Sequence, residues 1–185
     1  METVLRVGMF VAASAGILML SWRSLRAPRS HGFYRFFAFE ALLALILLNS
    51  PRWFREPLSG RQIVSWLLLA ASLGLAIEAF RLLHKIGRPA RRETRGANLG
   101  FENTTTLVTV GAYRFIRHPM YASLLALTWG ACLKHPSAPS AGLALAASGF
   151  LLATAITEER ENLAQFGTAY ADYMRTTRRF IPFLF

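Results

Sequence analysis

The sequence predicts an all-α integral membrane protein with about five transmembrane helices. Hydrophobic residues make up 54% of its 185 residues, and they form continuous blocks instead of the periodic spacing that marks a soluble amphipathic helix. Most of the basic residues lie in the connectors between these blocks, which is the arrangement that orients helices in a membrane. The length fits one domain-sized unit of roughly 100–200 residues.

Five apolar blocks provide the expected spans. With approximate boundaries, they cover residues 4–20, 33–48, 63–83, 119–133 and 138–156. A bilayer core of about 30 Å requires about 20 helical residues, so the third and fifth blocks are long enough. The second and fourth are short, and we expect their flanking residues to snorkel or their helices to end at shallow depth. Pro136 and Pro139 predict a tight hairpin between the fourth and fifth helices.

Basic residues predict the orientation of these spans. The connector after the first block contains Arg23, Arg26, Arg29 and Arg35. The connector at 84–112 and the tail are also strongly basic, whereas the connector after the fourth block has only Lys134. The positive-inside rule therefore places the first and third connectors and the C-terminus in the cytoplasm, with the N-terminus outside. Together with the small size, this predicts a multi-pass protein of a prokaryotic inner membrane.

Two polar segments differ in character. Glycine and proline punctuate the connector at 84–112, which predicts that most of it is loop. From Glu158 onward, apolar residues recur at three- and four-residue spacing, at Leu163, Phe166, Tyr170 and Tyr173. That spacing predicts an amphipathic helix lying along the membrane surface.

Several partners and site types are not expected. The net charge of +11 does not indicate nucleic-acid binding, because no long basic face carries the interleaved aromatic residues that such binding needs. Cys132 is the only cysteine, so an internal disulfide and a zinc cluster are excluded, and we expect no metal site. Arg6, Glu40 and Glu78 are functional candidates because of their depth in or near the spans, but the sequence assigns no task to Arg6 or Glu40.

The stretch from Gly111 to Tyr121 contains residues suited to binding an anion. Pro119 follows His118 at the start of the fourth predicted helix, where the missing N–H of proline costs nothing. The helix N-terminus then offers free N–H groups and the positive end of its dipole to a carboxylate or phosphate. Arg117 adds a guanidinium whose planar fork matches a planar anion.

A pair of carboxylates, Glu158 and Glu159, follows the fifth apolar block. The predicted hairpin places them beside His118, so we expect all three to share one pocket at the membrane surface. Paired carboxylates bind amines, hydroxyls or a cation, and aromatic faces attract a sulfonium or ammonium. The nearby tyrosines are Tyr113, Tyr121, Tyr170 and Tyr173. Each of the two elements also has a simpler interpretation when it is considered alone. Arg117 and His118 also fit an interfacial anchor, and Glu158 and Glu159 fit a solvated helix end.

Residues 107–121 read Leu-Val-Thr-Val-Gly-Ala-Tyr-Arg-Phe-Ile-Arg-His-Pro-Met-Tyr. They resemble the signature of the isoprenylcysteine carboxyl methyltransferase and phospholipid methyltransferase superfamily. A second set resembles the C-terminal pattern of that superfamily: Glu158-Glu159, Leu163, Phe166-Gly167, Tyr170, Tyr173 and Arg179-Phe180-Ile181-Pro182. Two residues depart from the pattern. Ser123 stands where glycine is common, and Ala112 stands where proline is common.

The resemblance implies S-adenosylmethionine as the cofactor, in a cytoplasm-facing pocket that the C-terminal segment closes. It also implies an opening on the lipid side for an apolar, lipid or prenyl-like acceptor. The cofactor-pocket positions are Tyr113, Arg117, His118, Pro119, Tyr121, Glu158 and Glu159, to which we add Tyr170. Arg81 matches an arginine that the carboxyl methyltransferases place near the substrate carboxylate. The catalytic candidates are therefore Arg81, Arg117 and Glu159. We accordingly divide the chain into an N-terminal three-helix membrane region, 1–83, and a catalytic region, 84–185.

The expected reaction is in-line transfer of a methyl group to an oxygen, nitrogen or sulfur nucleophile, in which positioning contributes most. A carboxylate acceptor needs no base, and Arg81 or Arg117 would orient it. An amine acceptor must lose a proton, to Glu158, Glu159 or His118. Two alternatives stay open. Membrane sterol and steroid reductases, which use a nicotinamide cofactor, have a similar Arg-His-Pro element, and a non-enzymatic membrane scaffold would need no cofactor.

Overall fold

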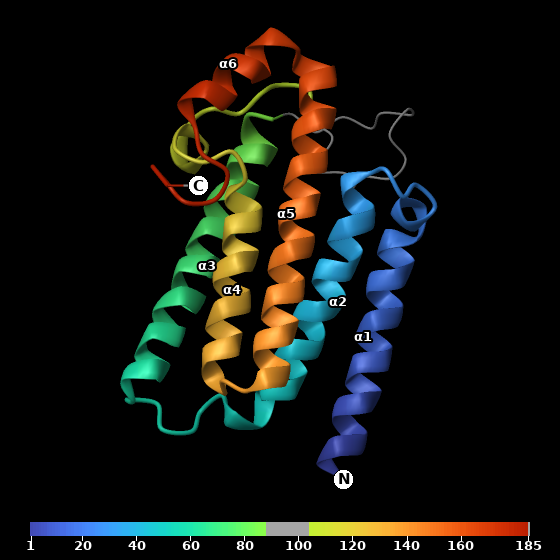
Figure 1. Ribbon diagram of the computed structural model, residues 1–185, viewed down its shortest axis with the longest axis vertical. Helices are drawn as coiled ribbons and strands as arrows, with labels where there is room; N and C mark the ends of the chain where they lie inside the picture. Colours follow the sequence, from blue (N-terminus) through green and yellow to red (C-terminus); the bar gives the residue numbers. More distant parts are fainter. Residues whose placement is uncertain (88–103, 185) are drawn as a thin grey trace.

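The computed structural model describes residues 1–87 and 104–184 of the chain. These residues form an all-α bundle in which five long helices run side by side and a sixth, short helix crosses one end (Figure 1). The described residues contain no β-strand, and Ile116 and Arg178 form an isolated bridge. The predicted all-α class is therefore confirmed. The middle of the 84–112 connector, which the sequence predicts to be loop, lies outside the described residues.

The long helices contain the five apolar blocks and extend beyond them. They are α1 (Glu2–Leu25), α2 (His31–Asn49), α3 (Gly60–Lys85), α4 (Pro119–Lys134) and α5 (Ala138–Phe166), followed by α6 (Thr168–Thr176). Two 3-10 turns, η1 (Ser50–Arg52) and η3 (Gly111–Arg114), lie between them. α5 continues to Phe166, past the predicted end near residue 156. The prediction stopped early because hydropathy detects the apolar part of a helix and not its polar extension.

Four helical segments among the described residues are long and apolar enough to cross a membrane: α1, α2 with η1, α3 and α5. α4 has only 16 residues, a length of about 24 Å, against a hydrocarbon core of about 30 Å. Arg61 Nη1 donates to the carbonyls of Leu133 and Lys134, both at 2.5 Å. Ser65 Oγ donates to the carbonyl of Gly130 at 2.7 Å. The carbonyls at the end of α4 are thus satisfied inside the protein, as a lipid environment requires.

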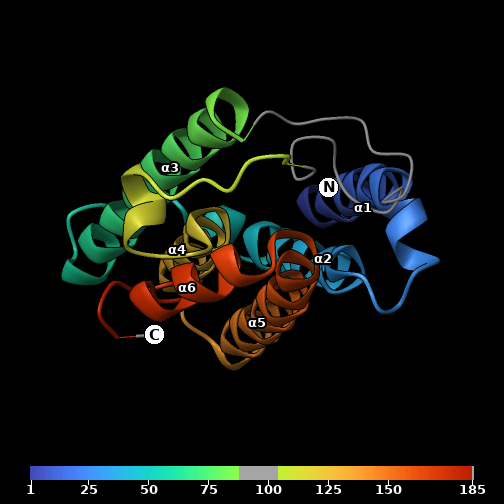
Figure 2. The same cartoon turned by 90° about the horizontal axis from the view of Figure 1, so that it is seen from above.

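The helices pack as neighbouring pairs. α3 packs chiefly against α4, α2 chiefly against α5, and α1 lies beside α2 at the edge of the bundle (Figure 2). Three residues, His135 to Ser137, join α4 to α5. Ser137 Oγ accepts a hydrogen bond from the N–H of Ser140 at 3.3 Å, and Pro139 lies in the first turn of α5. The predicted hairpin is therefore confirmed.

Gly167 separates α5 from α6. Its φ of +58° and ψ of −130° define a conformation that residues with a Cβ rarely adopt. The turn directs α6 across the end of the bundle at which α4 begins (Figures 1 and 2). The prediction of one amphipathic helix from Glu158 onward is wrong, because the segment up to Phe166 belongs to α5, whereas Tyr170 and Tyr173 belong to α6.

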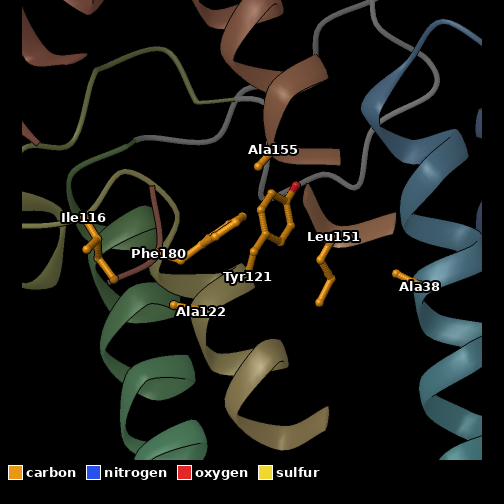
Figure 3. Packing of buried hydrophobic residues seen from close by; sticks show 7 residues of the cluster. All are labelled: Ala38, Ile116, Tyr121, Ala122, Leu151, Ala155 and Phe180. Atoms are coloured by element: carbon orange, nitrogen blue, oxygen red, sulfur yellow. The ribbon is translucent and has the colours of Figure 1, made fainter. Parts of the chain in front are cut away.

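The segment after α6 returns to the start of α4. The N–H of Arg117 donates to the carbonyl of Arg178 at 2.7 Å, and the N–H of His118 donates to the carbonyl of Arg179 at 3.1 Å. Phe180 then enters a buried apolar cluster. Figure 3 shows its other members, which are Ala38, Ile116, Tyr121, Ala122, Leu151 and Ala155. The tail therefore contributes to a buried cluster that α2, α4 and α5 also build.

Replacing Gly167 by alanine is expected to destabilise the protein. No atom lies within 4 Å of the position that the added Cβ would occupy, so the cost is conformational, about 1–3 kcal/mol. Thermal unfolding in detergent should show a lower midpoint. Gly142→Ala in α5 is the matched control, because it also adds a Cβ in open space, but at a helical position that favours alanine. Equal midpoints for the two variants would contradict the role of Gly167.

Candidate active site

A cavity lies at the end of the bundle where α4 begins. Its empty space is about 830 Å³, open solvent at the mouth included. Its polar lining residues are Arg35, Thr104, Tyr113, Arg117, His118, Tyr121, Glu158, Asn162, Tyr170 and Tyr173. Its apolar lining residues are Phe39, Leu83, Leu107, Val108, Met120, Leu124 and Phe166. The cavity thus brings together most of the predicted site residues.

His118 lies close to both predicted carboxylates. It immediately precedes α4, and its side chain is 3% exposed. Its Nε2 lies 3.4 Å from Oε1 of Glu159, and its Nδ1 lies 3.8 Å from Oε2 of Glu158. Nε2 has no hydrogen-bond partner among the described residues. The predicted proximity of these three residues is confirmed, and the buried Nε2 faces the Glu159 carboxylate.

Glu158 and Glu159 point in different directions, because successive helical residues are about 100° apart. Glu158 lines the cavity. Glu159, whose side chain is 5% exposed, instead accepts hydrogen bonds from two arginines. Arg117 Nε donates to Oε1 at 2.8 Å. Arg179 donates from Nε to Oε1 at 3.1 Å and from Nη2 to Oε2 at 3.0 Å. Glu159 therefore ties the end of α5 to the start of α4 and to the tail.

The guanidinium of Arg117 is also bound to backbone carbonyls. Its Nη1 donates to the carbonyl of Thr177 at 2.5 Å and to that of Met174 at 3.3 Å. Hydrogen bonds from a charged donor are stronger than those between neutral groups. Arg117 borders the cavity, but its Nε and Nη1 hold α6 and the tail against the start of α4.

Three buried tyrosines form the wall of the cavity near Glu158. Burial raises the pKa of Tyr113, and the nearby Glu158 carboxylate raises it further. Burial likewise raises the pKa of Tyr170 and of Tyr173. The phenols are therefore neutral at physiological pH, and they offer aromatic faces and O–H groups rather than bases. Tyr173 Oη donates to the carbonyl of Tyr113 at 2.6 Å, which joins α6 to η3.

Pro119 and Tyr121 place the first turn of α4 beside the cavity. Pro119 is buried at the first turn of the helix. The Tyr121 ring stacks on the His118 ring, with centroids 5.4 Å apart and planes at 19°. Figure 3 shows the same ring beside Phe180, with its hydroxyl directed toward Ala155 of α5. The predicted role of Pro119 in starting α4 agrees with this geometry.

Arg81 does not lie with the other predicted site residues. It is exposed on α3, where it borders a surface depression with Glu78 and Lys85. Leu83 is a residue of α3 that lines the cavity. Because two helical residues differ by about 200° in direction, Arg81 faces the other way. The Glu78 carboxylate accepts a hydrogen bond from the N–H of Ala112 at 3.0 Å and so positions η3.

Arg35 and Phe39 line the cavity from α2, and the sequence did not predict them as site residues. Arg35 sits at the boundary of an apolar block, so the sequence suggests only a connector charge. The signal that identifies it is helical spacing, because His31, Arg35 and Phe39 recur every four residues and share one face. The Glu161 carboxylate accepts from the N–H of His31 at 3.1 Å and lies 2.9 Å from its Nδ1. This pair holds that face of α2 against α5.

Comparisons relate the chain to known proteins. Residues 61–166 match the family described as phospholipid methyltransferase. The chain is 32% identical over 131 residues to a protein named methanethiol S-methyltransferase 2 from Bradyrhizobium diazoefficiens, in a match that covers 66% of this chain and 48% of that protein. The chain thus spans about half the length of this curated relative. No solved structure matches the chain. The residues that match the family include His118, Glu158 and Glu159, but neither Arg35 nor the tail.

Glu159→Gln should destabilise the protein strongly, because it leaves two guanidiniums without their carboxylate. Removing one partner of a buried ion pair costs about 3–5 kcal/mol, which thermal unfolding in detergent would show as a much lower midpoint. Asp172→Asn is the matched control. It breaks the pair with Arg175 on α6, whose side chains are 71% and 81% exposed, and an exposed pair contributes little. Similar midpoints for the two variants would show that the Glu159 pairs do not hold the tail.

Proposed function

Because the chain belongs to the phospholipid methyltransferase family, we propose that it transfers a methyl group from S-adenosylmethionine to an apolar or lipid-like acceptor. The family and the four apolar helices make the chain a multi-pass integral membrane protein. The observation that carries the proposal is the cavity in which His118 and Glu158 meet the buried tyrosines. It offers polar, charged and aromatic groups at one end of the bundle.

The residues of this cavity fit S-adenosylmethionine. When bound, this cofactor supplies a methyl group on a positively charged sulfonium. The Glu158 carboxylate places negative charge beside a cation, and the faces of Tyr113 and Tyr170 attract one. The His118 imidazole also lines the cavity, and an imidazole can donate or accept a hydrogen bond with a polar group of the ligand. Pro119 starts α4, whose first N–H groups suit a carboxylate.

Arg117, Glu159 and Arg179 are positioning residues in this proposal. Their hydrogen bonds hold the tail and the end of α6 against the start of α4, and α6 lines the cavity with Tyr170 and Tyr173. A closed site keeps water away from the reacting groups and strengthens the electrostatic interactions inside it. In-line transfer depends mainly on the alignment of the two reactants. These three residues therefore favour the reaction by fixing the walls of the site, without contacting the methyl group. Arg81 is assigned no role, because it borders a different depression.

The proposed acceptor is apolar, with an oxygen, nitrogen or sulfur nucleophile. Phe39, Met120 and Leu124 line the part of the cavity that lies along α2 and α4. Apolar walls with a few polar groups at one end are typical of sites that bind apolar small molecules. The relative from Bradyrhizobium is named for methanethiol, so a small thiol is the first acceptor to test.

Purified protein in detergent should bind S-adenosylmethionine and not NADPH, and it should transfer labelled methyl groups to an apolar acceptor. A ligand that binds only the folded form stabilises it by about 2.7 kcal/mol at 100 times its Kd, so the thermal midpoint should rise. Glu158→Gln and His118→Ala should weaken the affinity measured by calorimetry about tenfold or more, equal to about 1.4 kcal/mol.

Asp172→Asn is the control for Glu158→Gln, because it makes the same change of charge on the exposed face of α6. It should leave the affinity unaltered. Stabilisation by NADPH alone would favour the reductase alternative, and stabilisation by neither cofactor would favour a scaffold. Either result would refute the proposed methyl transfer.

We propose further that the site end faces the cytoplasm of a prokaryotic cell, with the protein in the inner membrane. The N-terminus lies at the opposite end of the bundle (Figure 1). The connector between α1 and α2 and the tail, which lie at the site end, are rich in arginine, as the positive-inside rule expects of cytoplasmic segments. In cells, Asp172→Cys should react with a membrane-impermeant thiol reagent only after lysis. Labelling of intact cells would reverse the orientation.

A further inference from the structure

A surface depression lies between α2 and α5, at the end of the bundle that holds the cavity. Arg29, from the connector between α1 and α2, borders it together with Tyr34 of α2 and with Arg160 and Glu161 of α5. None of these residues lines the cavity. Successive helical residues point about 100° apart, so Tyr34 points away from its neighbour Arg35 in the cavity wall. The depression is therefore a separate feature on another side of the same two helices.

The two arginines give the depression an excess of positive charge. Arg29 and Arg160 are exposed, and the side chain of neither has a hydrogen bond or ion pair with another described residue. The connector that carries Arg29, residues 26–30, contains no acidic residue. Glu161 also borders the depression, but its carboxylate accepts a hydrogen bond from the N–H of His31 and lies 2.9 Å from Nδ1 of that residue. The depression thus offers two guanidiniums, whose planar forks match the oxygens of a phosphate.

Aromatic side chains continue from the depression toward the middle of the bundle. The Tyr34 ring contacts the Phe33 ring, with centroids 5.5 Å apart. Phe33 in turn contacts Phe37 at 5.2 Å, and Phe37 stacks on Phe150 of α5 at 5.3 Å. Phe150 lies two helical turns before Thr157, which borders the depression, and therefore on the same face of α5, about 10 Å along its axis. All four rings are half-buried. A charged end above an aromatic wall matches an amphipathic ligand better than a free anion.

We propose that this depression binds the headgroup phosphate of an anionic phospholipid from the surrounding bilayer, with an acyl chain along the aromatic rings. Arg29 and Arg160 lie just outside the apolar blocks, which is the depth of the lipid headgroups. The Tyr34 hydroxyl can donate to a phosphate oxygen. Phosphatidylglycerol fits better than phosphatidylcholine, whose choline cation meets two guanidiniums and a carboxylate already bound to His31. This lipid is not the methyl acceptor, because the residues of its site do not line the cavity.

The bound phosphate connects three segments of the chain. Arg29 belongs to the connector between α1 and α2, Tyr34 to α2 and Arg160 to α5, and one phosphate has enough oxygens to accept from all three side chains. α1 lies at the edge of the bundle beside α2 (Figure 2), so the lipid holds the connector that follows α1 against α5. A ligand that binds only the folded form stabilises it. The lipid therefore acts on the stability of the bundle, and its binding does not depend on the proposed methyl transfer.

The test adds lipids to delipidated protein in detergent and measures their Kd by native mass spectrometry and the thermal unfolding midpoint. Dioleoylphosphatidylglycerol should bind saturably and raise the midpoint. Dioleoylphosphatidylcholine, which has the same acyl chains, should bind about fivefold more weakly or less tightly still. Glycerol 3-phosphate has a phosphate but no acyl chain, and at the same concentration it should leave the midpoint unaltered. Arg29→Gln and Arg160→Gln should each raise the Kd of phosphatidylglycerol about fivefold.

Arg175→Gln is the matched control, because it removes the same charge from an exposed residue of α6 at the same end of the bundle. It should leave the Kd of phosphatidylglycerol unaltered, and an equal loss in this variant would reveal unspecific attraction to positive charge and refute the site. Equal binding of the two lipids overturns the proposal, as does an Arg29→Gln or Arg160→Gln variant that keeps the wild-type Kd. Equal stabilisation by glycerol 3-phosphate would show a site for free phosphate, and the lipid would then be the wrong occupant.

Discussion

The buried Glu159 carboxylate, held between the guanidiniums of Arg117 and Arg179, is the interaction on which the site depends. A charge removed from water is tolerated only when partners compensate it, and here the partners come from the start of α4 and from the tail. Satisfying one carboxylate therefore brings together three segments that are far apart in the sequence. The bridge between Ile116 and Arg178 and the hydrogen bond from Tyr173 strengthen the same closure with neutral groups.

The adjacent Glu158 shows how helix geometry divides one motif between two tasks. Two neighbouring carboxylates on a helix point about 100° apart, so only one of them lines the cavity while the other is bound to arginines. The same rotation explains α3, where Leu83 lines the cavity and Arg81 is exposed two residues earlier. A charged residue near the end of a helix thus belongs to the site only if the helix turns it inward.

The combination of a charged end and an apolar interior suits a reaction between a polar cofactor and an apolar acceptor. α4 connects the two parts, because it begins beside His118 and continues through Met120 and Leu124 along the cavity. Its far end is held by hydrogen bonds from Arg61 and Ser65. A helix too short to span the bilayer comfortably is therefore fixed at both ends, and its first turn stays aligned with the glutamates of α5.

Local features of the sequence determined the helices, the hairpin and the meeting of His118 with the two glutamates. Apolar blocks specify helices in lipid, and prolines beside them specify where α4 and α5 begin. Only the tertiary structure decided that Gly167 separates α6 from α5, that Arg81 faces outward and that Arg35 enters the cavity. A helix that is apolar on nearly every side carries little amphipathic signal. Its rotation about its own axis is therefore set by packing against neighbouring helices, and that rotation decides which side chains face the cavity.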